Sequence, residues 1–349
     1  MYRSHVLVCG GSGCTSAGAP KILEVLNKEI AKAGIKNEVS VVETGCHGLC
    51  DYGPIVVVYP GPTFYSKVRP EDIPEIVNEH LVNGQVVSRL VHNAEITDEG
   101  IKSINETDFY KKQYRIALRN CGIINPENIE EYIATGGYEA LGRVLTQYTP
   151  EQVIQIIIDS GLRGRGGGGL PTGIKWKLAR ANDADQKYVC CNADEGDPGA
   201  FMDRSVLEGD PHVVLEAMTI AGYAIGASQG YIYIRAEYPL AIERLNKAIA
   251  QAREYGLLGK DIFGTGFNFD IELRLGAGAF VCGEETALMT SIEGNRGEPR
   301  PRPPFPAQKG LFQKPTLLNN VETYANIPQI ILNGPEWFSS MGTEKSKGT

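Results

Sequence analysis

Four cysteines near the N-terminus have types and spacings that suit metal chemistry. Cys9 and Cys14 form one pair, Cys46 and Cys50 form another, and each pair lies in a glycine-rich turn after a run of β-branched residues. Four thiolates from two loops of a small sheet can enclose a [2Fe-2S] cluster, and the glycines let the backbone approach the sulfur atoms. Such a cluster carries one electron at a time, so the sequence predicts an electron-transfer protein.

Two other uses of the four cysteines stay open at this point. Structural zinc also takes four thiolates, although its loops more often have two residues between the cysteines of a pair. Two disulfides would fit the pairing, but the chain opens MYRSHVLV without an apolar leader and contains no run long enough for a membrane span. We therefore expect a cytoplasmic protein without direct membrane insertion, in which disulfides are rare.

A glycine-rich segment, GLRGRGGGGLPTGIKW, lies near the middle of the chain. Gly164, Gly166 and Gly169 match GxGxxG, but the preceding EQVIQIIIDS has the pattern of a helix, so the Rossmann fingerprint is not satisfied. A P-loop is excluded because Lys175 does not directly follow a glycine. What remains is a loop of exposed N–H groups beside Arg165 and Lys175, which suits a phosphate or a cofactor ring. A flexible structural loop is the alternative.

An acidic turn follows the predicted strand KYVCCN. It contains Asn192, Asp194, Glu195 and Asp197, at the strand end where open α/β sheets bind ligands. Carboxylates in this place can accept hydrogen bonds from ribityl or ribose hydroxyls. A solvated acidic turn is the alternative.

Three later motifs add polar groups and glycines. The turn GAGAFVCGEET follows a strand and opens a helix, so Gly283 allows close approach while Glu284 and Glu285 can hold cofactor hydroxyls or repel an extra phosphate. The stiff arm PRPPFPA carries Arg302 and Phe305. Asn319 and Asn320 stand where a helix is expected to begin, and helix capping is the alternative to a cofactor contact.

The elements that position these residues are those of two α/β domains. Residues 1–83 are predicted as one small domain, with strands at 5–8, 39–43 and 55–59 and helices at 19–33 and from residue 70. Residues 84–112 are predicted as a linker or docking arm. Strands at 187–192, 230–236 and 269–275 alternate with helices at 212–226, 240–255 and 284–291, which indicates a largely parallel sheet. Further helices are expected at 128–135, 138–147 and 150–159 and from Asn319 to near Asn333. This second domain is expected over 113–335.

The composition is that of a globular protein. Of 349 residues, 42% are apolar and 22% are charged, enough for two domains or more. The formal charge of −8 leaves no basic stripe, so we expect no nucleic-acid partner.

Five motifs in this order, GLRGRGGGGLPTGIKW, CNADEGDPGAF, GAGAFVCGEETALM, PRPPFPA and NNVET, resemble the flavin-bearing NADH dehydrogenase subunit of respiratory complex I. The same module occurs as the diaphorase beta subunit of multimeric, electron-bifurcating iron hydrogenases. The cysteine domain resembles a thioredoxin-like [2Fe-2S] ferredoxin, which makes the hydrogenase type the nearer one. The resemblance implies that a Rossmann-like α/β domain, binding FMN and NAD(H), follows this ferredoxin domain.

The resemblance also implies roles for individual residues. It places around FMN Gly164, Gly166, Lys175, Asn192, Asp194, Gly283, Glu284, Asn319 and Asn320, and near the dinucleotide Glu195, Asp197, Phe280, Glu285, Arg302 and Phe305. Arg165 and Gly167 join the cofactor-binding set, and Cys9, Cys14, Cys46 and Cys50 are the cluster ligands. No catalytic side chain is expected, because the flavin carries the chemistry. Leu170 stands where members commonly have phenylalanine, and Arg302 stands where some have lysine.

Family members continue into a region that holds a [4Fe-4S] cluster, and no cysteine follows Cys282 here. We therefore expect residues 336–349 to begin a C-terminal region that this chain does not complete, and the N-terminal cluster to be peripheral rather than the flavin's first acceptor. Cys121, Cys190, Cys191 and Cys282 are expected to be buried small side chains.

The expected function is hydride exchange between NAD(H) and FMN, with single electrons passed to iron-sulfur clusters of a multi-subunit hydrogenase or dehydrogenase. Expected partners are its large subunit and a small thioredoxin-like [2Fe-2S] subunit, in a hetero-oligomer. The alternatives are an NADP-linked version, a complex I NADH:quinone oxidoreductase subunit, and a non-catalytic iron-sulfur scaffold with a vestigial flavin site.

Overall fold

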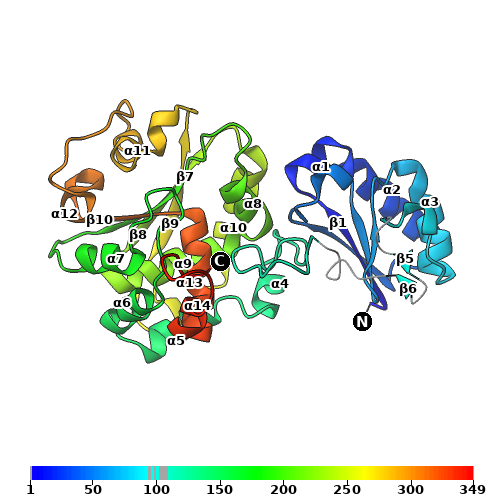
Figure 1. Cartoon of the computed structure of the whole chain (residues 1–349), viewed down its shortest axis with the longest axis horizontal. Helices are drawn as coiled ribbons and strands as arrows, with labels where there is room; N and C mark the ends of the chain where they lie inside the picture. Colours follow the sequence, from blue (N-terminus) through cyan, green and yellow to red (C-terminus); the bar gives the residue numbers. More distant parts are fainter. Residues whose placement is uncertain (1, 93–95, 98–99, 102–108, 349) are drawn as a thin grey trace. The chain divides into compact units, whose positions relative to one another are not determined.

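The computed structural model describes residues 2–92, 96–97, 100–101 and 109–348 (Figure 1). The chain divides into two compact units, one of Met1–Arg115 with Arg119–Pro126 and one of Ile116–Leu118 with Glu127–Thr349. The first unit extends past residue 83, because Val87, Leu90 and Val91 are buried in its hydrophobic core. Much of the rest of the 84–112 segment lies outside the described residues.

The first unit is built on a four-stranded mixed sheet. Its strand order is β2 (Val39–Thr44), β1 (Ser4–Cys9), β3 (Val56–Tyr59) and β4 (Thr63–Tyr65). Strand β1 runs parallel to β2 and antiparallel to β3. The small pair β5 (Ile96–Thr97) and β6 (Gly100–Ile101) is antiparallel. The cysteines therefore lie where β1 ends and in the loop that follows β2.

Helix α2 (Ala19–Lys32) covers this sheet because Ile22, Leu26 and Ile30 recur at helical spacing and are buried. A second helical run begins at Pro70 and comprises Pro70–Asp72, α3 (Ile73–Glu75) and Ile76–Val82. These elements match the predicted ones closely. The prediction missed the strand β4 and the short helix α1 (Ser12–Ser16), which carries Cys14. The remaining helical turns are Cys50–Tyr52 and Ser88–Leu90.

The second unit contains a parallel four-stranded sheet. The strand order is β10 (Thr316–Asn320), β7 (Tyr188–Ala193), β8 (Gln229–Arg235) and β9 (Asp270–Gly276), and all three pairings are parallel. Parallel strands place their carboxyl ends at one edge, so the acidic turn after β7 and the two asparagines that end β10 lie together. The predicted parallel sheet is confirmed.

Helix α9 (Pro211–Ile225) is the central helix of this unit, and nearly all of its side chains are buried. It contacts β7, β8 and the helices α5, α6, α7, α10 and α13 (Figure 1). The other helices are α4 (Ile129–Ala134), α5 (Glu139–Gln147), α6 (Pro150–Asp159), α7 (Thr172–Arg180), α8 (Met202–Gly209), α10 (Pro239–Glu254), α11 (Glu285–Ile292), α12 (Pro306–Lys309), α13 (Val321–Asn333) and α14 (Pro335–Ser339). In the described parts of the chain, no helix combines the length and the apolar character that a membrane span needs.

The structure corrects one boundary near the site. Asn319 and Asn320 were expected to start a helix, but both end strand β10, and α13 begins one residue later at Val321. Asn320 is also the N-cap of α13, since its side-chain oxygen accepts hydrogen bonds from the backbone N–H groups of Glu322 and Thr323. The prediction also missed α7 and α8, both of which carry residues of the site.

Candidate functional site

The structure brings the four N-terminal cysteines together as a chain of thiol contacts. Cys9 contacts both Cys14 and Cys46, and the Sγ atoms of Cys46 and Cys50 are 3.9 Å apart. None of the four is in a disulfide bond, so the disulfide alternative finds no support. In the described residues, no three His, Cys, Asp or Glu side chains surround one point closely enough for a single metal ion. A two-iron cluster takes two thiolates on each iron, which an extended set of four sulfur atoms suits.

Glycines lie next to the four cysteines at positions where a larger side chain would collide with them. A Cβ atom on Gly11 would lie 2.7 Å from the Cys46 Cβ atom, and one on Gly53 would lie 2.8 Å from the Cys14 Sγ atom. The N–H group of Gly48 donates to the Cys46 sulfur at 3.3 Å. Backbone N–H donors of this kind stabilise thiolate and cluster sulfur. These residues fit a [2Fe-2S] cluster.

Two of the four thiols, those of Cys9 and Cys46, have raised pKa values and hold their protons tightly. The contact with Cys14 raises the pKa of Cys9 to about 12, and burial adds to this. The contact with Cys9, with burial, raises the pKa of Cys46, whereas the pKa of Cys14 is lowered by its contact with Cys9. Cluster assembly therefore has to displace protons.

In the second unit, two adjoining cavities of about 370 Å³ and 770 Å³ lie at the carboxyl edge of the sheet. Gly166, Asn192, Gly283 and Asn320 line both of them. The smaller cavity is also lined by the predicted residues Gly164, Lys175, Glu285, Arg302 and Asn319, and the larger one by Arg165, Gly167, Asp194, Glu195, Asp197, Phe280 and Glu284. The structure thus brings nearly all predicted cofactor residues to two connected spaces.

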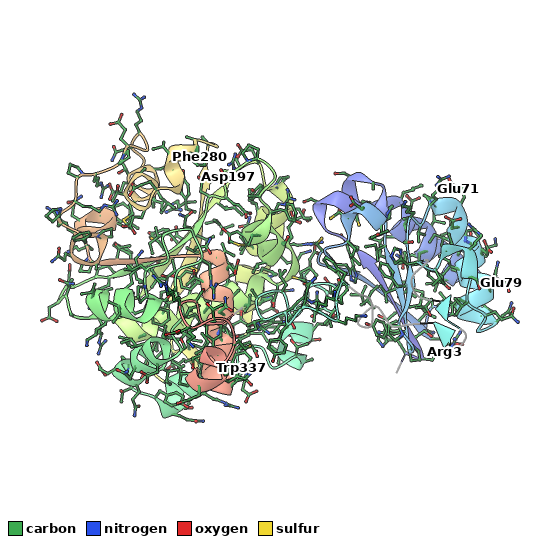
Figure 2. The ribbon with its side chains drawn as sticks, viewed as in Figure 1. Arg3, Glu71, Glu79, Asp197, Phe280 and Trp337 are labelled. Atoms are coloured by element: carbon green, nitrogen blue, oxygen red, sulfur yellow. The ribbon has the colours of Figure 1, made fainter. Side chains whose placement is uncertain are left out.

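Phe305 is the exception. It lines neither of these cavities, and its side chain is exposed. Phe280, by contrast, lies at the mouth of the larger cavity, where its ring packs so closely on Gly196 that a Cβ atom there would be 2.7 Å away. Asp197 lies near Phe280 at the same edge of the unit (Figure 2).

The glycine loop is held between two helices. Helix α6 ends before it and α7 begins after it, which confirms the helical interpretation of the preceding segment. The Gly164 N–H donates to the Leu170 carbonyl at 2.9 Å, and the Arg165 N–H donates to the Thr323 hydroxyl at 2.9 Å. The loop is therefore fixed at its base, while its glycines face the cavities.

The clearest sign of a missing ligand is Asp194. It is only 8% exposed, yet neither carboxylate oxygen finds a hydrogen-bond partner among the described residues. Burial raises its pKa, and the charge of Arg235 partly opposes this. Because unpaired buried carboxylates are costly, Asp194 indicates a hydroxyl-bearing ligand in the larger cavity. These residues fit the flavin mononucleotide that the sequence predicts.

Neighbouring carboxylates are already occupied as helix caps. Glu195 accepts hydrogen bonds from the backbone N–H groups of Met202, Asp203 and Arg204 at the start of α8. Glu284 accepts from those of Thr286 and Ala287 at the start of α11, each at 2.9 Å. Burial alone would raise the pKa of Glu284, but a hydrogen bond from the Thr286 hydroxyl, these two N–H groups and the charge of Arg302 lower it. Both residues therefore also fix the cavity walls.

Two cations of the site are paired with carboxylates. Lys175 Nζ lies 3.0 Å from Glu285 Oε2, and Arg302 Nη1 lies 2.7 Å from Glu285 Oε1. A second nitrogen of Arg302 lies 3.3 Å from Glu284 Oε1. A phosphate entering the smaller cavity therefore has to compete with Glu285 for Lys175 and Arg302.

Sequence reasoning missed Asp203. This residue is on α8 and lines the larger cavity, and its Oδ2 accepts a hydrogen bond from Asn320 Nδ2 at 2.6 Å. Also missed were Gly168, Leu318, Thr323, Gly196, Ala200, Met202 and Val281 as lining residues. Gly169 was named only as part of the GxGxxG match, and it lines the smaller cavity. Leu170 was noted only as a departure from the family pattern. The only sequence feature that could have indicated Asp203 is its position in the run FMDR, directly after the acidic turn.

Comparisons with known proteins agree with this picture. Residues 1–81 match the thioredoxin-like [2Fe-2S] ferredoxin family, and residues 157–329 match the Nuo51 FMN-binding domain. The NADP-reducing hydrogenase subunit HndC of Solidesulfovibrio fructosivorans is 69% identical over 239 residues, covering 68% of this chain and 48% of that protein. An NADH-quinone oxidoreductase subunit of Rhizobium meliloti is 48% identical over 67% of this chain and 55% of that protein.

Two further matches extend over nearly the whole chain. The NAD-reducing hydrogenase HoxS subunit alpha of Cupriavidus necator is 40% identical, covering 99% of this chain and 56% of that protein. The crystal structure of an NAD⁺-reducing [NiFe]-hydrogenase in the H2-reduced state matches with a TM-score of 0.57 and 28% identity, covering 99% of this chain and 56% of that chain. The chain spans about half the length of these relatives. It belongs to the thioredoxin-like [2Fe-2S] ferredoxin family through residues 1–81 and to the Nuo51 FMN-binding family through residues 157–329.

Proposed function

We propose that the chain is the NAD(H)-converting flavoprotein part of a multi-subunit hydrogenase or dehydrogenase. The site would hold FMN, which would supply hydride exchange with NAD(H) and single-electron transfer to iron-sulfur clusters. The observation that carries this proposal is the unpaired carboxylate of Asp194, buried in a cavity that the glycine loop also lines. The relatives' names support it, because they are subunits of NADH-quinone oxidoreductases and of NAD- and NADP-reducing hydrogenases.

In this proposal the chain's own residues bind and orient. Asp194 accepts hydrogen bonds from ligand hydroxyls. Asn192 is fixed for ligand contact, since its Nδ2 donates to the Gly283 carbonyl at 2.9 Å and its Oδ1 accepts from the Asp194 N–H at 3.0 Å. Lys175 and Arg302 supply positive charge for phosphate oxygens once Glu285 releases them. No side chain has to act as an acid or a base.

The variant Asp194→Ala tests the site. We expect FMN affinity to fall at least tenfold, about 1.4 kcal/mol, because a charged hydrogen-bond acceptor is lost. The thermal stability of the flavin-free protein should stay equal or rise, since the carboxylate has no partner to lose. Flavin fluorescence titration and thermal unfolding measure the two effects.

Asp185→Ala is the matched control, because Asp185 is an exposed carboxylate of the same unit that pairs with Lys314. It should leave FMN affinity unchanged. Equal FMN affinity in Asp194→Ala and wild type would contradict the assignment. Absence of both flavin binding and NADH-dependent dye reduction in the wild type would favour the scaffold alternative instead.

An NADP-linked activity is the second candidate. It is favoured by the name of the NADP-reducing relative HndC and by Arg302 as a cation beside the cavity. Glu285 weighs against it, because this carboxylate already neutralises Arg302 and would repel a 2′-phosphate. Steady-state dye reduction with NADH and with NADPH separates the two, and a strong preference for NADPH would reject the NAD-linked proposal.

We further propose that Cys9, Cys14, Cys46 and Cys50 ligate a [2Fe-2S] cluster that is peripheral to the hydride reaction. Cys46→Ser is then expected to abolish the two-iron EPR signal of the reduced protein while NADH-dependent dye reduction is kept. Cys282→Ser is the control, since Cys282 is a buried thiol of the other unit. Loss of dye reduction together with the EPR signal would show instead that the cluster is the flavin's outlet. Retention of the signal would reject the ligand set.

The partners in this proposal are a hydrogenase or dehydrogenase large subunit and a small thioredoxin-like [2Fe-2S] subunit, within a cytoplasmic hetero-oligomer. A [4Fe-4S] cluster and electron bifurcation belong to the complete assembly. Identifying the chains that co-purify with this one distinguishes a hydrogenase from a quinone-linked enzyme.

A further inference from the structure

A segment outside the ferredoxin family match packs onto the cysteine loop of the first unit. The Phe109 ring lies over Gly48, where a Cβ atom would be 3.8 Å from the ring. The buried Tyr110 donates from its hydroxyl to the His47 carbonyl. Gly122 packs directly on the His47 ring, since a Cβ atom there would be 2.5 Å from Nδ1. Residues at both ends of the 109–122 segment therefore contact the loop that follows Cys46.

Arg115 places a positive charge in this 109–122 segment. Its guanidinium carbon lies 4.5 Å from the centre of the Tyr110 ring, and its Nη1 donates to the Cys121 carbonyl at 3.5 Å. Burial raises the pKa of Tyr110 to about 12. The charge of Arg115 lowers this pKa, whereas Cys46 and Cys9 raise it. Tyr110 thus links Arg115 to the cysteine loop, because its ring contacts the guanidinium group and its hydroxyl reaches the carbonyl of His47, the residue after Cys46.

We propose that Arg115, held over Tyr110, sets the reduction potential of the cluster in the first unit. The inference rests on the proposed cluster and goes beyond it, because it assigns a tuning role to a residue outside the ligand loops. Reduction adds one negative charge to the cluster, and a nearby cation stabilises that charge. Tyr110 and His47 are both buried, so the charge of Arg115 acts on this part of the loop through protein and is screened less than at an open surface.

The test is an EPR-monitored redox titration of the full chain loaded with FMN and cluster. In Arg115→Gln, the ratio of reduced to oxidised cluster at one fixed solution potential is expected to fall several-fold, which is a shift toward more negative potential. Arg115→Lys keeps the charge and should stay close to the wild type. The midpoint potential of FMN in the same samples should not change in any variant.

Arg3→Gln is the matched control. Arg3 precedes β1, about 20 Å along the strand from Cys9, and its guanidinium pairs with Glu38 (Figure 2). Its replacement should leave the cluster potential unchanged, because solvent and salt screen a charge at that distance.

Three results would overturn the proposal: an unchanged cluster potential in Arg115→Gln, an equal shift in Arg115→Lys, or a parallel shift of the flavin potential. A wild-type protein without any two-iron EPR signal would instead reject the proposed cluster itself. The two failures are therefore distinguishable.

Discussion

Replacing Gly173 with alanine is expected to lower the free energy of unfolding of the second unit by about 2 kcal/mol. Gly173 lies on α7 where this helix crosses α6. A Cβ atom at residue 173 would lie 2.5 Å from the Ile158 backbone nitrogen and 2.9 Å from the Ile157 carbonyl carbon. Backbone atoms cannot move aside as a flexible side chain can, so the helices have to separate. The gain of about 1 kcal/mol in helix propensity does not offset this.

The same substitution should also weaken FMN binding. Helices α6 and α7 hold the two ends of the glycine loop, and α7 carries Lys175 at the smaller cavity. A displacement of α7 therefore moves both the glycine loop and Lys175. We expect the affinity for FMN to fall more than the stability loss alone would cause, because the cavity walls shift even in the folded state.

Gly142→Ala is the control for this prediction. Gly142 is also helical, on α5, but the nearest atom to an added Cβ is a Phe263 ring carbon at 3.9 Å. Alanine there should raise stability by up to about 1 kcal/mol. Tryptophan fluorescence during denaturation measures both variants, because the only two tryptophans, Trp176 and Trp337, belong to the second unit. Equal stabilisation by both alanines would show that the α6–α7 crossing is not tight.

The local sequence pattern was enough to predict many of the strands and much of the candidate site. The cysteine pairs follow strands that are recognisable by their β-branched runs, so their meeting at one end of a small sheet could be predicted. The acidic turn after β7 was equally accessible, because parallel strands place their carboxyl ends at one edge. These are features in which a residue's neighbours in the sequence fix its position.

What the sequence did not reveal depends on contacts between distant segments. Strand β10 is short and directly precedes a helix, so its pairing with β7 gives no local signal. Asp203 reaches the cavity only because α8 folds back beneath the acidic turn, capped by Glu195. Tyr110 and His47, which are in contact, lie 63 residues apart in the chain. Periodicity and spacing carry no information about such pairings.

Asp203→Asn is expected to change how stability depends on pH. Burial, aided by Glu195, raises the pKa of Asp203 from 3.8 to about 7, although hydrogen bonds from Asn320 and from the Glu322 N–H group lower it. A raised pKa means that between about pH 4 and pH 7 the folded state binds more protons than the unfolded state. The free energy of unfolding therefore falls as pH rises through this range, by at most about 4 kcal/mol.

Asparagine is close in shape to the protonated acid and cannot ionise. At pH 4 the variant should be at most as stable as the wild type, because its amide nitrogen cannot accept one of the hydrogen bonds that Asn320 and the Glu322 N–H group donate to Asp203. As the pH rises to 7 its stability should increase relative to that of the wild type, because it avoids the buried charge. The difference between the two unfolding free energies, measured by tryptophan fluorescence on flavin-free protein from pH 4 to pH 8, isolates this one group. The difference should grow through the range and level off above pH 7.

Glu322→Gln separates this effect from that of the other buried carboxyl group nearby. Burial also raises the pKa of Glu322, but the charge of Arg165 opposes the shift. Its pH-dependent contribution to stability should therefore be smaller than that of Asp203. If the difference in unfolding free energy between Asp203→Asn and wild type does not change with pH, Asp203 does not change its charge near neutral pH. If the difference for Glu322→Gln changes more than that for Asp203→Asn, Glu322 is the residue that changes its charge. The expected rise instead means that the carboxyl group which orients Asn320 at both cavities exchanges its proton near neutral pH.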